Sequence, residues 1–207
     1  MKRLLTLTEK KHFDILAAAR EEFKEKGLLG ASMNSLAKRA EVSKRTLYNH
    51  FPSKDILFQY IINQLRDSFS QSVNFEYQSK KPLDEQLHIA AMSEIQLLGS
   101  ECFRDLNRII LAEFIRSPEL ASRTLEHLGQ QKDGLHVWIN DAINDSRLEA
   151  IDPDYAAQQF FGLIKANAFW PQLLMNRVFP SSEQQKIISD DAVFMFLSRY
   201  EIKKRGS

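Results

Sequence analysis

The side chains best suited to chemistry in this 207-residue chain lie between Ser32 and Phe51. Once the apolar residues of this stretch are assigned to an interior, six polar side chains remain on one helix face: Lys44, Arg45, Thr46, Tyr48, Asn49 and His50. Cationic, hydroxyl, phenol and amide groups are the ones that contact DNA phosphates and base edges. The pattern therefore predicts a nucleic-acid interface.

Within this face, we expect base or near-base contacts from Lys44, Arg45, Thr46 and Asn49. Arg45 has the planar donor geometry that pairs bidentately with guanine. The candidates for phosphate contact are Ser43, Tyr48, His50 and Lys54, and Ser32 belongs to the same candidate DNA-binding surface. Lys54 also falls at a predicted helix start, where free backbone amides attract the same anion.

These side chains can share a face only if two short helices and a tight turn position them. Ser32 occupies an N-cap position, and apolar residues then recur at three- and four-residue spacing: Met33, Leu36, Ala37 and Ala40. Ser43 can cap the next helix, from which Leu47 is expected to pack back onto Leu36 and Ala37 together with Val42 of the turn. This arrangement is a helix-turn-helix.

The stretch His12–Leu57 resembles the DNA-binding domain of the TetR/AcrR-type (tetracycline-repressor) family of bacterial transcriptional regulators. The residues that carry the resemblance are Ile15, Ala19, Phe23, Lys26-Gly27, Ser32-Met33, Leu36-Ala37, Val42-Ser43, Thr46-Leu47-Tyr48, Phe51, Lys54 and Leu57. One residue departs from the pattern. The family often has glycine in the turn where this chain has Glu41, and glycine suits a turn that needs a positive φ.

The resemblance implies a homodimer, more often a repressor than an activator, that binds two half-sites of a roughly palindromic operator. It also implies a C-terminal domain that binds a ligand and forms the dimer. We accordingly expect double-stranded DNA, a second copy of the chain and a small apolar or amphipathic effector as partners. We expect no catalytic residue, no metal and no cofactor.

The distribution of charge supports DNA as the partner of the N-terminal end. The whole chain has a net charge of +1, but residues 1–60 carry 12 Lys/Arg against 7 Asp/Glu, and residues 61–207 carry 16 against 20. A lone Cys102 excludes an internal disulfide and a Cys-rich zinc site. No run of 18 apolar residues occurs and the first residues lack a signal-peptide core, so we expect a cytoplasmic protein without a membrane anchor.

The remaining pattern predicts an all-α protein of about nine helices. The expected helices cover 9–26, 32–40, 43–51, 54–77, 83–98, 102–115, 118–146 with a break near 129–134, 153–170 and 182–200. Residues 201–207 are expected to form a loose basic tail. We predict a DNA-binding domain at 1–53 and a regulatory and dimerisation domain at 54–207, joined by the long helix that begins at Lys54.

The second half carries two candidate sites. The candidate effector-binding residues are Phe103, Phe114, Trp138, Lys165, Asn167 and Trp170. The aromatic residues could instead fill a solid core, and Lys165 and Asn167 could instead reach solvent. The candidate dimer interface consists of two apolar stripes, Ala157, Phe161, Ile164 and Ala168 on one helix and Val193, Phe196, Leu197 and Tyr200 on the other. These stripes could also pack within one subunit.

Two other classes of function fit parts of the pattern. Glu85 and His88 have the Glu-x-x-His spacing of helical di-iron bundles, and Asp133 and His136 form a looser copy. A bundle site also needs inward carboxylates on two further helices, which the pattern does not show. The other alternative, a helical protein-binding adaptor, would leave the polar face of residues 44–50 without a role.

Overall fold

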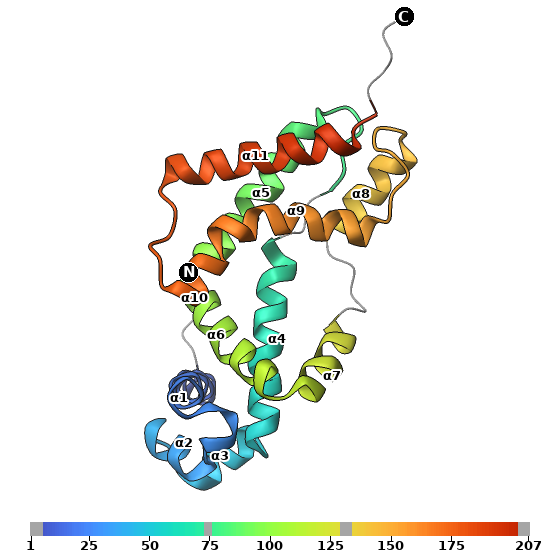
Figure 1. Ribbon diagram of the computed structural model, residues 1–207. Coiled ribbons are helices and arrows are strands. Elements are labelled where there is room, and N and C mark those ends of the chain that lie inside the picture. The colour runs from blue at the N-terminus through green and yellow to red at the C-terminus, as the bar shows by residue number, and fades with distance from the viewer. Residues whose placement is uncertain (1–5, 73–75, 129–133, 203–207) are drawn as a thin grey trace, which may run out of the picture. The chain divides into compact units, whose positions relative to one another are not determined.

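The computed structural model describes residues 6–72, 76–128 and 134–202, and within these ranges the chain is helical (Figure 1). The helices are α1 (Leu7–Gly30), α2 (Met33–Arg39), α3 (Lys44–His50), α4 (Lys54–Ser72), α5 (Leu83–Gly99), α6 (Glu101–Arg116), α7 (Pro118–Leu128), α8 (Gly134–Asn144), α9 (Pro153–Ala168), α10 (Trp170–Met175) and α11 (Ser182–Tyr200). In the described ranges the extended pairing is limited to one isolated bridge between Leu148 and Glu201. The all-α prediction is confirmed.

Local capping signals explain where most helices begin. Asp152 accepts hydrogen bonds from the first amides of α9, and Ser181 forms a capping box with Gln184 at the start of α11. A second capping box, between Thr6 and Glu9, starts α1 two residues earlier than expected. Hydrogen bonds from the Thr6 backbone and side chain lower the pKa of Glu9, which keeps this cap anionic.

The described residues form two more helices than the nine expected, because the 118–146 stretch forms α7 and α8, as the expected break implies, and a short helix, α10, follows α9. Phe169 leaves the helical region (φ −140°, ψ −63°), so α9 ends at Ala168 and α10 is a separate short helix. The break expected near 129–134 falls largely on 129–133, and the tail expected at 201–207 falls mostly on 203–207. Both segments lie outside the described residues.

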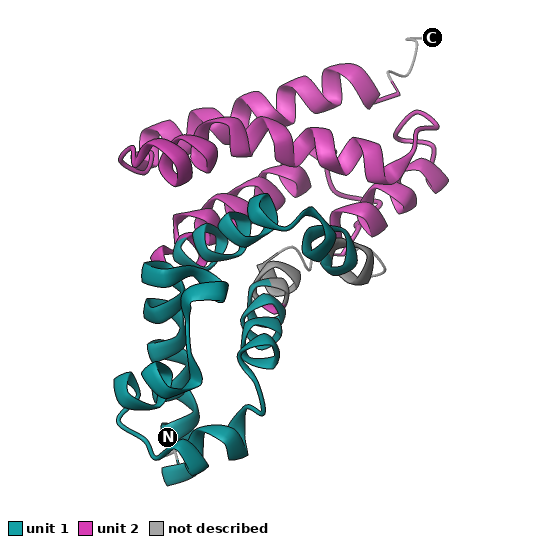
Figure 2. Cartoon of the chain, turned by 60° about the horizontal axis from the view of Figure 1, so that its bottom comes forward, with its two compact units in different colours: residues 1–66, 105–128 teal, residues 67–104, 129–207 magenta. Residues whose placement is uncertain are grey.

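The chain divides into two compact units (Figure 2). Unit 1 combines Met1–Arg66 with Asp105–Leu128, and unit 2 combines Asp67–Arg104 with Gly129–Ser207. This division differs from the expected boundary after residue 53, because most of α6 and all of α7 pack with the N-terminal helices. The assignment of DNA binding to 1–53 and of regulation to 54–207 stays a functional prediction.

Unit 1 has a continuous apolar core. The buried residues come from α1 to α4 and from α6, and include Ile15, Leu16, Phe23, Leu36, Leu47, Leu57, Phe58, Ile61, Leu106, Ile109 and Ile110. Phe23 and Phe58 meet edge to face, with ring centroids 5.8 Å apart. Full burial of one such side chain contributes about 1.5–3 kcal/mol, so this core supplies a firm base for the short helices α2 and α3.

Unit 2 is built on the packing of α5, α8, α9 and α11. Trp138 is completely buried, and its Nε1 donates a hydrogen bond of 3.0 Å to Oε1 of Gln86. The same oxygen accepts from the backbone N–H of Gln78 at 2.8 Å, while Nε2 of Gln86 donates to the carbonyls of residues 78, 81 and 82. One buried amide therefore fixes both the tryptophan and the loop that precedes α5.

Candidate nucleic-acid interface

The two serine caps predicted for the helix-turn-helix are present. Ser32 Oγ accepts a hydrogen bond of 3.1 Å from the N–H of Ser35 and starts α2. Ser43 Oγ accepts one of 3.0 Å from the N–H of Thr46 and starts α3. The hydroxyls of Ser43 and Thr46 also lie 2.8 Å apart and bond to each other. Both hydroxyls therefore lie at the N-terminal end of α3, where free amides favour anions.

The apolar residues of the motif point inward as the spacing predicts. Leu36, Ala37 and Leu47 are buried, and Val42 packs against the same core. The opposite face of α3 is left to solvent: Lys44, Arg45, Tyr48 and Asn49 are exposed, and Thr46 and His50 are partly exposed. The structure thus places all six predicted polar side chains on one accessible helix.

The turn between α2 and α3 places Glu41 at a positive φ, a backbone conformation that is unfavourable for a residue with a Cβ. Glu41 has a φ of 52°, in the left-handed region that favours glycine. The turn is closed by backbone hydrogen bonds, from Val42 N–H to the Ala37 carbonyl at 3.0 Å and from Glu41 N–H to the Lys38 carbonyl at 3.2 Å. Glu41 therefore has a strained backbone conformation in the turn that sets the direction of α3.

An ion-pair cluster that the sequence reading missed fixes α2 against α1. Arg39 Nε lies 3.1 Å from the buried carboxylate of Glu22, and the Arg39 guanidinium also binds the Glu25 carboxylate through both Nη atoms. Lys26 Nζ adds a bond of 2.8 Å to Glu22. Burial alone would raise the pKa of Glu22, but its bonds to Lys26 and Ser35 and the charges of Lys26 and Arg39 lower it. The sequence feature that could have indicated this cluster is the pair of acids Glu22 and Glu25, three residues apart on α1, together with Arg39 at the end of α2.

The structure gives Lys54 a different environment from the expected phosphate contact. Its ammonium donates hydrogen bonds to three backbone carbonyls, of Leu28 at 2.8 Å, Leu29 at 3.2 Å and Ala31 at 3.3 Å. An ammonium has three donors, so this geometry uses all of them inside unit 1. Lys54 is therefore placed to hold the segment that enters α2, whereas a phosphate would have to compete for the same donors.

Aromatic rings support the C-terminal end of α3. His12 of α1 stacks on Phe51 with ring centroids 5.1 Å apart, and Tyr60 of α4 meets His12 edge to face at the same distance. The ring of His50 lies 5.7 Å from that of His12. Burial and the neighbouring His50 lower the pKa of His12. The neutral His12 ring is thus part of the base on which His50, a predicted phosphate contact, rests.

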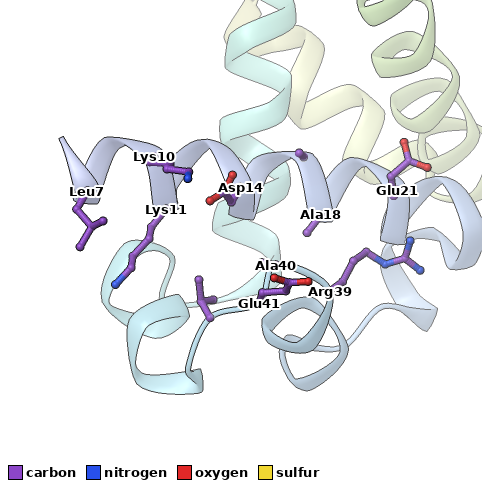
Figure 3. Close-up of a pocket in the computed structure, with 11 residues that line it drawn as sticks. Leu7, Lys10, Lys11, Asp14, Ala18, Glu21, Arg39, Ala40 and Glu41 are labelled. Carbon is purple, nitrogen blue, oxygen red and sulfur yellow. The ribbon is translucent and has the colours of Figure 1, made fainter. Parts of the chain in front are cut away.

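A groove runs between the outer face of α1 and the α2–α3 turn (Figure 3). Its volume is about 640 Å³, and its charged lining residues are Lys10, Lys11, Asp14, Glu21, Arg39 and Glu41. Cations and acids are equal in number there, and Arg39 is already bonded to Glu22 and Glu25. The groove therefore lacks the excess of positive charge that phosphate binding requires, and the polar face of α3 remains the candidate interface.

The six candidate effector-binding residues do not form one group. Phe114 packs against the core of unit 1, whereas the other five belong to unit 2. Trp138 is enclosed and bonded to Gln86, Phe103 is buried, and Trp170 is exposed. Lys165 Nζ lies 3.4 Å from the buried carboxylate of Glu94 and 5.3 Å from the centre of the Phe161 ring. Asn167 is exposed and lines two grooves of unit 2.

Most residues of the predicted dimer stripes pack within the subunit, which is the alternative that the sequence left open. Seven of the eight residues are buried in unit 2, namely Ala157, Phe161, Ile164, Ala168, Val193, Phe196 and Tyr200, and Leu197 is partly buried. Each helix has a second apolar face. On α11, Phe194 is 71% exposed and Met195 52% exposed, and on α9 the residues Gly162 and Ala166 are exposed. Between these faces lies a groove of about 500 Å³ that Met195, Gly162 and Ala166 help to line.

The residues considered for metal binding have other partners. His88 Nδ1 lies 2.9 Å from the hydroxyl of Ser189, and His136 Nδ1 lies 2.5 Å from the carboxylate of Asp154. Asp133 lies outside the described residues. Across the described ranges, His, Cys, Asp and Glu side chains do not gather in threes suited to a metal ion. Of the helices in these ranges, none combines the length and apolar character needed to cross a membrane.

Comparison with known proteins identifies the family of this fold. Residues 15–61 match the model of "Bacterial regulatory proteins, tetR family", and residues 85–202 match that of "AefR-like transcriptional repressor, C-terminal domain". The crystal structure of a TetR family transcriptional regulator from Pseudomonas syringae pv. tomato is 38% identical and superimposes with a TM-score of 0.82. That superposition covers 95% of this chain and 100% of the other.

Two further relatives agree. The HTH-type transcriptional regulator UidR of Escherichia coli is 39% identical over 111 residues, which is 52% of this chain and 54% of UidR. The uncharacterised HTH-type transcriptional regulator YhgD of Bacillus subtilis is 23% identical over 194 residues, which is 91% of this chain and 93% of YhgD. The chain belongs to the TetR family of bacterial transcriptional regulators, which are DNA-binding helix-turn-helix proteins and not enzymes.

Proposed function

We propose that this protein is a homodimeric, ligand-responsive repressor that binds a roughly palindromic operator in the bacterial cytoplasm. The observation that carries the proposal is the exposed polar face of α3. This helix is anchored by the buried Leu47 and follows α2, which the Glu22–Arg39 ion pair holds to α1. A short helix with exposed Arg, Lys, Thr and Asn side chains matches the donor and acceptor pattern of the major groove. The match of residues 85–202 to a repressor family supports the repressor sign.

The contacts are divided between reading and positioning. Lys44, Arg45, Thr46 and Asn49 are assigned to base or near-base contact, and Ser43, Tyr48 and His50 to phosphates. The hydroxyl of Ser32 already accepts an amide hydrogen bond but keeps its own hydrogen for a phosphate oxygen, whereas the hydroxyl of Ser43 also bonds to that of Thr46. Lys54 is assigned to support of the entry to α2.

The test of DNA binding starts from fragments selected out of random DNA by the purified protein. Arg45→Ala is expected to reduce discrimination at one operator position by about 1–3 kcal/mol. Lys38→Ala is a matched control, because Lys38 is an exposed cation at the end of α2 outside the reading face. If six phosphates are neutralised per dimer, log K should fall with log salt at a slope of about −5. A flat response to salt, or equal losses on selected and scrambled DNA for Arg45→Ala, would contradict the assignment.

The dimer is proposed to form through the exposed faces of α9 and α11. Gly162 lies in the middle of α9, where glycine costs about 1 kcal/mol relative to alanine. A Cβ built on Gly162 meets no atom within 4 Å, so the packing of this subunit does not require a glycine there. A helix of a second copy that approaches closely would require one, and the exposed Phe194 and Met195 supply apolar surface beside it.

Two substitutions at one position test this interface. Gly162→Ala and Gly162→Leu both raise helix propensity, so both should leave the subunit folded. We expect Leu, but not Ala, to shift the sedimentation of the protein towards monomer and to lose operator affinity. Successive major grooves on one face of DNA are about 34 Å apart, so a monomer cannot bind both half-sites. A Gly162→Leu protein that stays dimeric would place the interface elsewhere.

The proposed effector is a small apolar or amphipathic molecule bound in unit 2, which contains the candidate residues Phe103, Trp138, Lys165, Asn167 and Trp170. Both tryptophans of the chain, Trp138 and Trp170, belong to unit 2, so their fluorescence reports ligand entry. A ligand that weakens operator binding tenfold must itself bind tenfold more weakly to the DNA complex, a coupling of about 1.4 kcal/mol. Compounds that saturate the fluorescence change without any change in operator affinity would contradict a regulatory role.

A further inference from the structure

The helix α1 is interrupted at Gly27, just before the helix-turn-helix. Gly27 has φ 68° and ψ 173°, and the chain then makes one more helical turn up to Gly30. That turn is closed by a bond of 3.1 Å from the Ala31 N–H to the Gly27 carbonyl. The interruption takes the N–H of Leu28 out of the regular hydrogen-bond pattern, so this buried donor needs another acceptor.

The acceptor is a carboxylate from a helix 85 residues further along the chain. Oε1 of Glu113, in α6, accepts the Leu28 N–H at 2.9 Å and a second hydrogen bond of 2.8 Å from Arg116 Nη1. Glu113 is only 3% exposed. Burial of a carboxylate is costly unless charged or polar donors surround it. Glu113 therefore depends on the Leu28 N–H and the Arg116 guanidinium being held in these positions.

Gly27 is required at this contact for two reasons. Its positive φ is unfavourable for other residues, and a Cβ at this position would lie 2.8 Å from Glu113 Oε1 and still closer to the Arg116 guanidinium. The backbone of α1 and the side chains of α6 therefore meet with no intervening atoms. Both partners belong to unit 1, so the contact lies within one compact body.

The same segment is held on its other side. The carbonyls of Leu28, Leu29 and Ala31 accept hydrogen bonds from Lys54 Nζ, while Glu113 holds the N–H of Leu28. The next residue after Ala31 is Ser32, the N-cap of α2. Residues 28–31 are thus fixed between α4 and α6 directly before the DNA-reading motif begins.

We propose that Glu113 is a positioning residue for operator reading, which fixes the orientation of the helix-turn-helix relative to α6. The inference rests on the proposed function and names the residue through which α6 acts on it. Helix α6 begins at Glu101 in unit 2 and ends at Arg116 in unit 1, so it is covalently shared by both units. Any change in unit 2 that displaces α6 reaches the entry to α2 through the Glu113–Leu28 hydrogen bond.

The consequence for DNA is a constraint on half-site spacing. With the hydrogen bond in place, the two reading helices of a dimer keep one separation, and an operator whose spacer is changed by one base pair binds poorly. Without it, residues 28–31 can pivot, and the dimer accepts altered spacers more readily. Glu113 therefore contributes to selectivity for spacing more than to affinity for one half-site.

The experiment compares Glu113→Ala, Glu113→Gln and Arg116→Ala, with Glu119→Ala, at an exposed position of α7, as the control. For each purified dimer, the affinity ratio between the selected operator and operators with one base pair added or removed is measured. We expect Glu113→Ala to reduce this ratio about tenfold. Glu113→Gln keeps an acceptor oxygen for Leu28 and should keep most of the ratio, and Glu119→Ala should keep all of it.

Arg116→Ala covers the case in which Glu113→Ala fails to fold, because Arg116 is largely exposed and its loss removes one of the two bonds to the carboxylate. It should give an intermediate loss of the spacing ratio. A folded Glu113→Ala dimer with the unchanged ratio would overturn the proposal, as would an unchanged ratio in Arg116→Ala if the first variant does not fold. Failure of the unaltered protein to bind DNA would instead refute the proposed function, so the two failures are distinct.

Discussion

Replacement of Glu41 by glycine should stabilise the protein and strengthen DNA binding, through two separable effects. At a φ of 52°, a residue with a Cβ is strained by about 1–2 kcal/mol. Glycine removes this strain but loses about 0.5–1 kcal/mol more conformational entropy on folding. The turn is closed by backbone hydrogen bonds of Val42 and residue 41 itself, which glycine keeps. The net gain in the free energy of unfolding should be about 0.5–1 kcal/mol.

The second effect of Glu41→Gly is electrostatic. Glu41 is exposed in the turn that leads into α3, so its charge faces the phosphates that α3 approaches. At about 10 Å in water, two unit charges interact by about 0.4 kcal/mol before salt screening. Its removal should therefore strengthen operator binding up to about twofold per subunit, or about fourfold for a dimer.

Glu41→Gln separates the two effects, because it removes the charge and keeps the backbone strain. We expect Gln to match Gly in operator affinity and to match the natural protein in stability. The measurements are urea unfolding followed by circular dichroism and fluorescence anisotropy of labelled operator at one salt concentration. If the glycine variant is no more stable than the glutamine variant, the argument from backbone strain is refuted.

Three further predictions concern other contacts. Burial and the neighbouring His50 lower the pKa of His12 in the folded protein, so the unfolded chain binds more protons below about pH 6.5. The free energy of unfolding should therefore fall as the pH drops below that value, and His12→Phe should reduce the fall. Thermal unfolding between pH 5 and 8 measures both. Lys54→Met leaves three carbonyls without their donor and should lower the free energy of unfolding by about 1–2 kcal/mol, with urea midpoints as the check. Gln86→Leu removes the hydrogen bonds of the Gln86 amide to the buried Trp138 N–H and to the loop before α5, and it should lower the free energy of unfolding by about 2–3 kcal/mol and change tryptophan emission; unchanged stability would contradict the role of the amide.

The sequence was sufficient for the features that depend on neighbouring residues. Ser32 and Ser43 are caps because a hydroxyl precedes an apolar helix, and Leu36 and Leu47 are buried because their spacing leaves them on one face. The positive φ at Glu41 was expected from the resemblance instead, because the family often has glycine at that point of the turn. These signals act within a few residues and therefore survive in the one-dimensional pattern.

Features that depend on distant partners were not predictable. Lys54 at a helix start suits a phosphate and a carbonyl cluster equally well, and only the folded path of residues 28–31 decides between them. Lys165 was a candidate effector contact, because the sequence does not show that Glu94, on another helix, lies beside it. The sequence also left open whether the α9 and α11 stripes pack within the subunit, since both helices have apolar residues on two faces and only the packing of unit 2 shows which face is covered.

The outward apolar face of α11 has a consequence for how such a regulator would respond to its own abundance. With Phe194 71% exposed and Met195 52% exposed, an isolated subunit carries a surface that favours pairing. Under the proposed pairing, operator occupancy at low abundance rises with the square of the subunit concentration, so a twofold fall in synthesis lowers occupancy about fourfold. Substitutions that weaken this face would then shift the dose at which transcription is released, without any change in the DNA sequence that is read.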